Sequence, residues 1–111
     1  MEENTYLQSL KHSLWNAIAG TRGGITRIEI LQLLRERPYN TNQLHEKLKL
    51  DYKTIQHHIR VLTNGNIIVT EDEKKYGSMY FLAPRLEENI GIFDEILDKI
   101  GKKKINVEGR K

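Results

Sequence analysis

The sequence predicts a single, mainly helical domain that carries a small β-hairpin. Along most of the 111-residue chain, apolar residues recur at the three- and four-residue spacing of amphipathic helices. Between residues 67 and 82 this spacing gives way to short β-branched and aromatic runs on either side of a charged loop. A chain of this length corresponds to one domain of ordinary size. We expect residues 1–101 to form this domain and residues 102–111 to form a basic, disordered tail.

Composition excludes several classes of protein and of site. The chain has no cysteine, which excludes a disulfide framework, a thiolate zinc site and a cysteine nucleophile. Every uninterrupted apolar run is far shorter than the roughly 20 residues that span a bilayer. No basic segment followed by an apolar one opens the chain, so no signal peptide is expected. We therefore expect a cytoplasmic protein without membrane contact.

Charge is distributed unevenly behind a net charge of +3. Residues 26–62 hold seven basic and four acidic side chains, and residues 102–111 hold five and one. The segment between them, residues 63–101, is acidic, with four basic and eight acidic side chains. The position of the basic segments is therefore more informative than the net charge.

The first two helices are predicted over residues 6–19 and from Thr26 onward. The first carries an apolar stripe, and the pair Gly23-Gly24 favours a turn after it. Thr26 and Glu29 have the spacing of a capping box for the second helix. Pro38 ends that helix, because a proline pushes the preceding residue out of the α region.

A third helix is predicted over residues 41–48, with Asn40 and Thr41 as competing caps. The fourth is predicted to begin after Asp51 as N-cap and to end at Asn64-Gly65. Only Lys49 and Leu50 separate the third helix from this cap. So short a connection is typical of a helix-turn-helix motif, which we place at about residues 41–64.

A hairpin of about residues 66–82 is predicted to follow, with a charged loop at residues 71–75. Pro84 closes its second strand and opens a last helix over roughly residues 85–100. The resulting order, α-α-α-α-β-β-α, describes a winged helix-turn-helix fold in which the hairpin is the wing.

A helical wheel of the fourth helix separates two faces. Ile55, Ile59 and Leu62 lie on one side. The opposite side carries only uncharged or cationic polar groups and no carboxylate, from Lys53, Thr54, Gln56, His57 and Arg60. Such donors suit base edges in the major groove and phosphates of DNA. The alternative is an ordinary solvated helix face, although such faces usually include acidic residues.

Secondary DNA contacts are predicted outside the fourth helix. Thr41 and Asn42 begin the third helix, where backbone N–H groups favour phosphate. Lys74 and Lys75 lie in the wing loop, which is equally compatible with a solvated turn. Arg27 is a weaker phosphate candidate, and the basic tail either adds non-specific affinity or only solubilises the chain.

A stretch within the fourth helix resembles a known family. Residues 54–62 read TIQHHIRVL, similar to the recognition-helix pattern T-V-x-x-H-L-x-V-L of ArsR-type winged-helix regulators. The wider string from Gly23 to Thr54 resembles the archaeal branch of that group, and the likeness covers about residues 23–82. The resemblance implies a dimeric DNA-binding regulator, with Lys53, Thr54, Gln56 and His57 where the family reads DNA and the loop 71–75 at its wing.

No metal site or cofactor is expected. The metal-sensing relatives use a cysteine pair on the recognition helix or Asp and His on the last helix, and neither set is present. His57 and His58 are adjacent and point about 100° apart, so they do not chelate one ion. We expect His58 to be a buried, hydrogen-bonded structural residue, His57 to be exposed, and His45 to lie on the surface.

A homodimer is predicted from the first and last helices. Their apolar stripes exceed what the helix-turn-helix core covers, although the two helices could also pack on each other within a monomer. The predicted dimer interface consists of Leu7, Leu10, Leu14, Trp15, Ile18, Phe93, Ile96, Leu97 and Ile100. Pairing about a two-fold axis would separate two recognition helices by about 34 Å, one turn of DNA.

The predicted function is sequence-specific binding of double-stranded DNA by a homodimeric transcriptional regulator. The alternative is a protein–protein interaction module within a larger assembly, because winged helices also serve as scaffolds. No catalytic residues are expected, since no nucleophile, paired carboxylates or phosphate-binding loop is recognisable. The sequence does not identify an effector.

Overall fold

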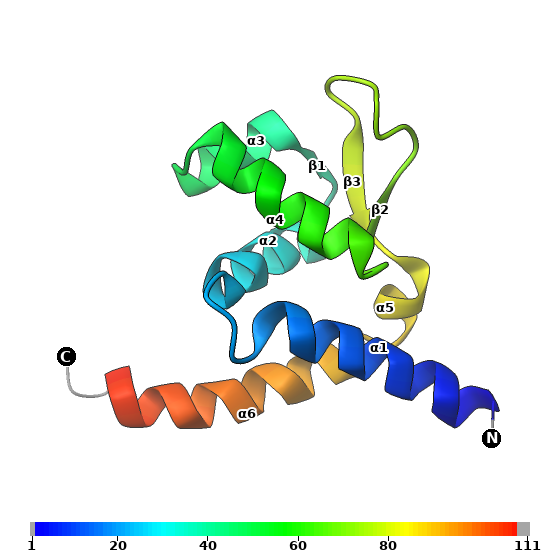
Figure 1. Cartoon of the computed structure of the whole chain (residues 1–111), viewed down its shortest axis with the longest axis vertical. Coiled ribbons are helices and arrows are strands. Elements are labelled where there is room, and N and C mark those ends of the chain that lie inside the picture. Colours follow the sequence, from blue (N-terminus) through cyan, green and yellow to red (C-terminus); the bar gives the residue numbers. More distant parts are fainter. Residues whose placement is uncertain (1, 109–111) are drawn as a thin grey trace.

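The structure is a computed structural model that describes residues 2–108 of the chain, with side chains for residues 5–101. Within this part, six helices and three short strands follow one another along the chain (Figure 1). The elements are α1 (Glu2–Ile18), α2 (Gly24–Glu36), β1 (Tyr39–Asn40), α3 (Thr41–Leu48), α4 (Tyr52–Asn64), β2 (Ile68–Thr70), β3 (Met79–Leu82), α5 (Pro84–Glu88) and α6 (Ile90–Glu108).

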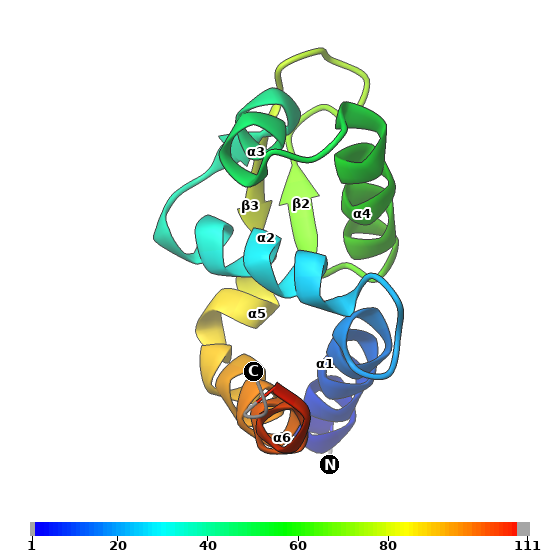
Figure 2. The same cartoon turned by 90° about the vertical axis from the view of Figure 1, so that its left-hand side faces the viewer.

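The elements form two layers that meet at α2. Helices α1 and α6 pack against each other at one end of the molecule (Figure 2). Helices α3 and α4 and the sheet form the other end, where α3 packs on α4 and the loop between β2 and β3 projects furthest from α1 and α6. This arrangement places the exposed side of the helix-turn-helix and the tip of the hairpin on the same end of the molecule.

The sheet contains a strand that the sequence did not predict. Strand β3 is central, and both β1 and β2 pair with it in antiparallel fashion. Tyr39 of β1 lies opposite Tyr80, and Val69 of β2 opposite Phe81. The two-residue β1 therefore joins the start of α3 directly to the hairpin.

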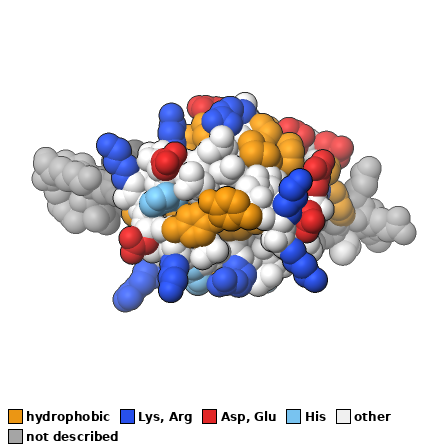
Figure 3. Space-filling view, turned by 90° about the horizontal axis from the view of Figure 1, so that it is seen from above, with side chains coloured by type: hydrophobic (Ala, Val, Ile, Leu, Met, Phe, Trp, Pro, Cys, Tyr) orange, Lys and Arg blue, Asp and Glu red, His pale blue; other side chains and the backbone are white. Residues whose placement is uncertain are grey.

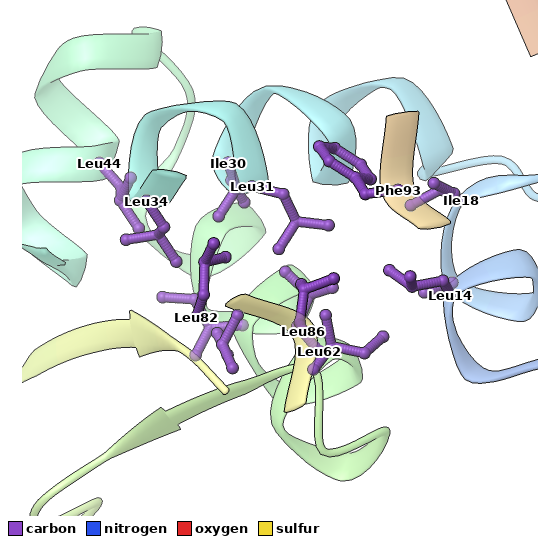
Figure 4. Close-up of a cluster of buried hydrophobic side chains, with 14 of the residues drawn as sticks. Leu14, Ile18, Ile30, Leu31, Leu34, Leu44, Leu62, Leu82, Leu86 and Phe93 are labelled. Atoms are coloured by element: carbon purple, nitrogen blue, oxygen red, sulfur yellow. The ribbon is translucent and has the colours of Figure 1, made fainter. Parts of the chain in front are cut away.

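One continuous apolar core joins the two layers (Figure 4). Its centre is made by Ile30, Leu31 and Leu34 of α2, with Leu62 of α4 and Leu86 of α5 against them. The core extends toward α1 and α6 through Leu14, Ile18 and Phe93. Aliphatic side chains dominate it, as expected from a chain with 7% aromatic residues.

Helix boundaries correct the sequence predictions at three places. Helix α2 begins at Gly24 after an N-cap at Gly23 without a side-chain cap, so the predicted capping box of Thr26 and Glu29 is wrong. The predicted last helix is broken at Asn89, whose ψ of 40° ends α5 before α6 begins. Helix α6 also continues to Glu108, so residues 102–108, expected in a disordered tail, have a helical backbone. The side chains of residues 102–108 and all of residues 109–111 lie outside the described part.

Candidate nucleic-acid interface

A short, well-defined turn sets the position of α4. The side chain of Asn40 accepts a hydrogen bond from the Gln43 N–H, and the Gln43 side chain accepts one from the Asn40 N–H, which settles the competition for the α3 cap in favour of Asn40. Lys49 ends α3 in the left-handed region, with φ of 59°. The ring of His45 hydrogen-bonds to the Leu50 carbonyl, so His45 holds the turn and is not a plain surface residue.

Helix α4 begins after Asp51 and ends at Asn64, as predicted, although the Asp51 side chain makes no cap hydrogen bond. Its far end is held by Arg85, whose guanidinium donates to the carbonyl groups of Gly65 and Asn66. Hydrogen bonds from neighbouring segments therefore hold the chain just before and just after α4.

The two faces of α4 lie as the helical wheel predicts. Ile55, Ile59 and Leu62 are buried in the core. The opposite face is exposed, and it consists of Lys53, Thr54, Gln56, His57 and Arg60. No acidic residue occurs anywhere in α4. The exposed face is therefore cationic and rich in hydrogen-bond donors.

His58 is buried and hydrogen-bonded, as predicted, but its partner is unexpected. Arg27 of α2 is also buried, with 4% of its surface exposed, and its guanidinium donates to Nδ1 of His58 at 2.9 Å. The same guanidinium donates to the Ala17 carbonyl and to the Thr21 hydroxyl. The prediction of Arg27 as a phosphate contact is therefore wrong, because its guanidinium is used inside the protein.

Burial and the neighbouring Arg27 guanidinium, with a further contribution from His57, lower the pKa of His58. Because Arg27 only donates, Nδ1 of His58 must accept and the imidazole is neutral. Burial likewise lowers the pKa of Arg27. This cluster links α1, α2 and α4 without an acidic group.

The wing loop is organised by one of its acidic residues. The carboxylate of Asp72 accepts a hydrogen bond from the Lys74 N–H, and the backbone carbonyl of Asp72 accepts one from the Ser78 hydroxyl. Gly77 has a φ of 84°, a conformation that favours glycine. Lys74 and Lys75 are exposed at this turn. The Asp72 carboxylate thus shapes the loop that presents the two lysines.

A hollow of about 390 Å³ separates α4 from the wing. Gln56, Ile59 and Arg60 line it from α4, and Lys74 and Lys75 from the wing loop. The other lining residues are Thr41, Tyr52, Thr63, Glu73, Tyr76, Gly77, Ser78 and Tyr80. Seen from this end, side chains of the hydrophobic class, which includes tyrosine, lie at the centre, with many Lys and Arg and several Asp and Glu side chains around them (Figure 3).

Three tyrosines line the hollow, although none of them is predicted from the sequence as a DNA contact. Tyr76 is 81% exposed, and Tyr80 is half-buried. Burial, together with the nearby Glu73 carboxylate, raises the pKa of Tyr80. Tyr52 contacts the His45 ring edge-on. Alternation of Tyr76, Ser78 and Tyr80 on one side of a strand was the available signal, but only the fold brings Tyr52 to the same place.

The predicted phosphate contacts of α3 lie at the same end of the molecule. Thr41 is half-buried and lines the hollow, whereas Asn42 is exposed. The structure thus gathers Thr41, Gln56, Arg60, Lys74 and Lys75 around one hollow.

The predicted dimer residues fall into two groups. Leu10, Leu14, Ile18, Phe93 and Ile96 are buried within the chain itself, so their assignment to a dimer interface is wrong. They cover each other because α1 packs on α6 and both join the core. Trp15 is 39% exposed, and Leu7, Leu97 and Ile100 are partly exposed. Trp15 and Ile96 also line a second, mainly apolar hollow of about 320 Å³ between α1 and α6.

The described part of the chain contains neither a metal-binding cluster nor a membrane-spanning helix. There, no three His, Asp or Glu residues lie close enough together to hold a metal ion. None of the helices described is both long and apolar enough to cross a bilayer.

A helix with an exposed, donor-rich face, preceded by a short turn and followed by an antiparallel hairpin, defines a winged helix-turn-helix domain. Residues 25–69 match the sequence model described as "Bacterial regulatory protein, arsR family". This segment, which runs from α2 to the middle of β2, is therefore similar to that family. No curated protein matches the chain.

Solved structures share the fold at low sequence identity. The homodimeric winged helix-turn-helix DNA-binding domain Mb0332 of Mycobacterium bovis has a TM-score of 0.63 at 15% identity, over 87% of this chain and 84% of that one. Reduced HlyU of Vibrio cholerae has a TM-score of 0.60 at 21% identity, over 90% and 97%. Rv0081 of M. tuberculosis has a TM-score of 0.60 at 20% identity, over 89% and 96%. These likenesses establish the winged helix-turn-helix fold.

Proposed function

We propose that this protein is a transcriptional regulator that binds double-stranded DNA sequence-specifically, with α4 in the major groove and the wing on the adjacent backbone. The observation that carries the proposal is the exposed face of α4, which combines Lys53, Gln56 and Arg60 with no carboxylate. Arginine and lysine donate to guanine, glutamine pairs with adenine, and all three reach phosphates. The similarity of residues 25–69 to the arsR family supports the same function, as does the fold shared with Mb0332.

Further contacts follow from the same placement. Thr54 and His57 complete the exposed face of α4. Thr41 and Asn42 lie at the start of α3, where backbone N–H groups approach a phosphate. Lys74 and Lys75 reach the backbone from the wing. The archaeal branch of the family remains a prediction from the sequence, which identifies no effector.

The test is a double variant, Lys53→Ala with Arg60→Ala, measured by binding to duplex DNA selected from a random pool. We expect an affinity loss of about 10- to 100-fold and a slope of log K against log salt that is shallower by about 2. Arg22→Ala is the control, because Arg22 is exposed in the α1–α2 turn, outside the proposed interface. Unchanged binding by the double variant would contradict the assignment of α4. Failure of the wild type to bind any duplex at low salt would favour a protein–protein module.

We also propose that the regulator is a homodimer joined through the exposed parts of α1 and α6. Trp15, Leu7, Leu97 and Ile100 provide an apolar surface on adjacent helices, and the homodimeric state of Mb0332 supports this assembly. The test is sedimentation of the wild type against Trp15→Glu. We expect a dimer and a monomer, respectively, with an inverted repeat among the selected duplexes only for the dimer. A monomeric wild type at micromolar concentration would refute the dimer.

A further inference from the structure

The hollow between α4 and the wing has the lining of a site for a polyanion that passes through it. Hydroxyl groups come from Thr41, Thr63, Ser78 and the three tyrosines, and the cationic groups from Arg60, Lys74 and Lys75. Glu73 is the sole acidic residue in this lining. Hydroxyl groups bind phosphate oxygens without needing a charge of their own.

The geometry of the proposed complex determines which part of DNA meets this lining. One sugar–phosphate strand separates each major groove from the neighbouring minor groove. If α4 occupies the major groove and the wing follows the adjacent backbone, that strand must cross the space between them. This step rests on the proposed function.

Two of the tyrosines are fixed before any ligand arrives. Tyr80 is half-buried, and β3 fixes its backbone between β1 and β2. Tyr52 packs edge-on against His45, which is itself hydrogen-bonded to Leu50. Little side-chain entropy is lost when such groups bind. Tyr76 is instead exposed on the wing and free to follow the strand.

We propose that Tyr52, Tyr76 and Tyr80 bind one phosphodiester strand of duplex DNA through their hydroxyl groups. In this arrangement the tyrosines provide a neutral part of the interface between the cations of α4 and those of the wing. Glu73 weakens the attraction and thereby limits binding to unselected DNA.

The test is a triple variant, Tyr52→Phe, Tyr76→Phe and Tyr80→Phe, which keeps the rings and removes the hydroxyl groups. We expect duplex affinity to fall about 30- to 100-fold, roughly three- to fivefold for each hydroxyl. The salt slope should be unchanged, because no charge is lost. Tyr6→Phe is the control, since Tyr6 is exposed on α1 and does not line this hollow. Glu73→Gln should bind several-fold more tightly.

Outcomes separate this inference from the proposed function. If the wild type binds no duplex, the function itself fails. If it binds and the triple Phe variant, shown to be folded by its circular dichroism spectrum, binds equally well, only the tyrosine contact is refuted. If the Phe variant keeps its affinity but the corresponding triple Ala variant loses it, and single-stranded DNA binds as tightly as duplex, the rings stack on bases and the phosphodiester assignment is overturned.

Discussion

The two faces of α4 carry polar side chains with opposite roles. On the buried face, His58 is 6% exposed and accepts a hydrogen bond from Arg27. The Arg27 guanidinium also donates to the Ala17 carbonyl and the Thr21 hydroxyl. On the exposed face, Lys53, Gln56 and Arg60 extend into solvent. The difference shows that polarity alone does not identify an interface. A buried polar group must be satisfied within the protein, whereas an exposed one is available to a partner.

From this difference between the two faces of α4, we expect substitutions on the buried face to change stability and substitutions on the exposed face to change DNA affinity. The largest loss of stability is expected for Arg27→Met, which keeps most of the apolar volume and removes every hydrogen bond of the guanidinium. The Ala17 carbonyl and His58 Nδ1 would lose their donor, at a cost of about 2–3 kcal/mol in the free energy of unfolding. Urea denaturation measures this loss.

Arg22→Met is the matched control for that variant, because Arg22 follows Thr21 in the α1–α2 turn but is exposed. We expect it to change the free energy of unfolding by less than about 0.5 kcal/mol. Equal midpoints for the two variants would show that the buried cluster does not stabilise the fold.

A somewhat smaller loss is expected for Gly23→Ala. An added Cβ would lie 2.5 Å from Cε1 of His58 and 2.6 Å from Nη1 of Arg27. Because these two side chains are hydrogen-bonded to each other, one must move, at a cost of about 1–3 kcal/mol. Thermal unfolding followed by circular dichroism measures the loss. Gly91→Ala, where the added carbon meets nothing within 4 Å, should be neutral or slightly stabilising.

Local sequence patterns predicted α4 but not the cluster beneath it. The period of apolar residues identifies which face of α4 is buried, and so it placed Lys53, Arg60 and His58 correctly. The partner of His58 lies 31 residues earlier in the sequence, and Arg27 has the polarity of a surface residue. Only the close approach of α2 to α4, which Gly23 permits, makes Arg27 a buried donor.

The apolar stripes of α1 and α6 show the same limit. Their spacing indicates a covered face but not whether the cover comes from the same chain or from a second copy. Leu14 and Phe93 are covered within the chain, while Trp15 is not fully covered. Strand β1 is not predictable from the sequence, because two residues are too few to show a pattern. The break at Asn89 is not predictable either, because the residue at the break is neither glycine nor proline.

The two adjacent histidines allow the difference between the buried and exposed faces of α4 to be tested by pH. The pKa of His58 is lowered in the folded state, chiefly by burial and by the Arg27 guanidinium. Above pH about 6.5 the imidazole is neutral in both states and the native state keeps its full stability. Below that value the unfolded state binds a proton more readily, so stability falls until the pH reaches the folded-state pKa. Chemical denaturation between pH 5 and pH 8 measures this fall.

The exposed neighbour His57 supplies the control for the pH dependence. A His57→Gln variant should keep most of the loss of stability on acidification, because burial and Arg27, the two larger causes of the lowered His58 pKa, remain. If the stability of His57→Gln did not change with pH, the loss on acidification would come from the exposed face and not from His58, contrary to the expected roles of the two faces.

The smallest effect on stability is expected for Gln56→Ala on the exposed face. Gln56 has no protein hydrogen bond to lose, as far as the described residues show, and alanine is the stronger helix former, so the free energy of unfolding should stay within about 0.5 kcal/mol. Affinity for the selected duplex should nevertheless fall about tenfold, while binding to mixed DNA changes little, because a glutamine that reads adenine contributes mainly to discrimination. Parallel titrations of the two duplexes measure this difference. If Gln56→Ala were instead to destabilise the fold by more than about 1 kcal/mol and leave the preference among duplexes intact, the exposed face would have a structural role, and the separation between the two sides of α4 would not hold.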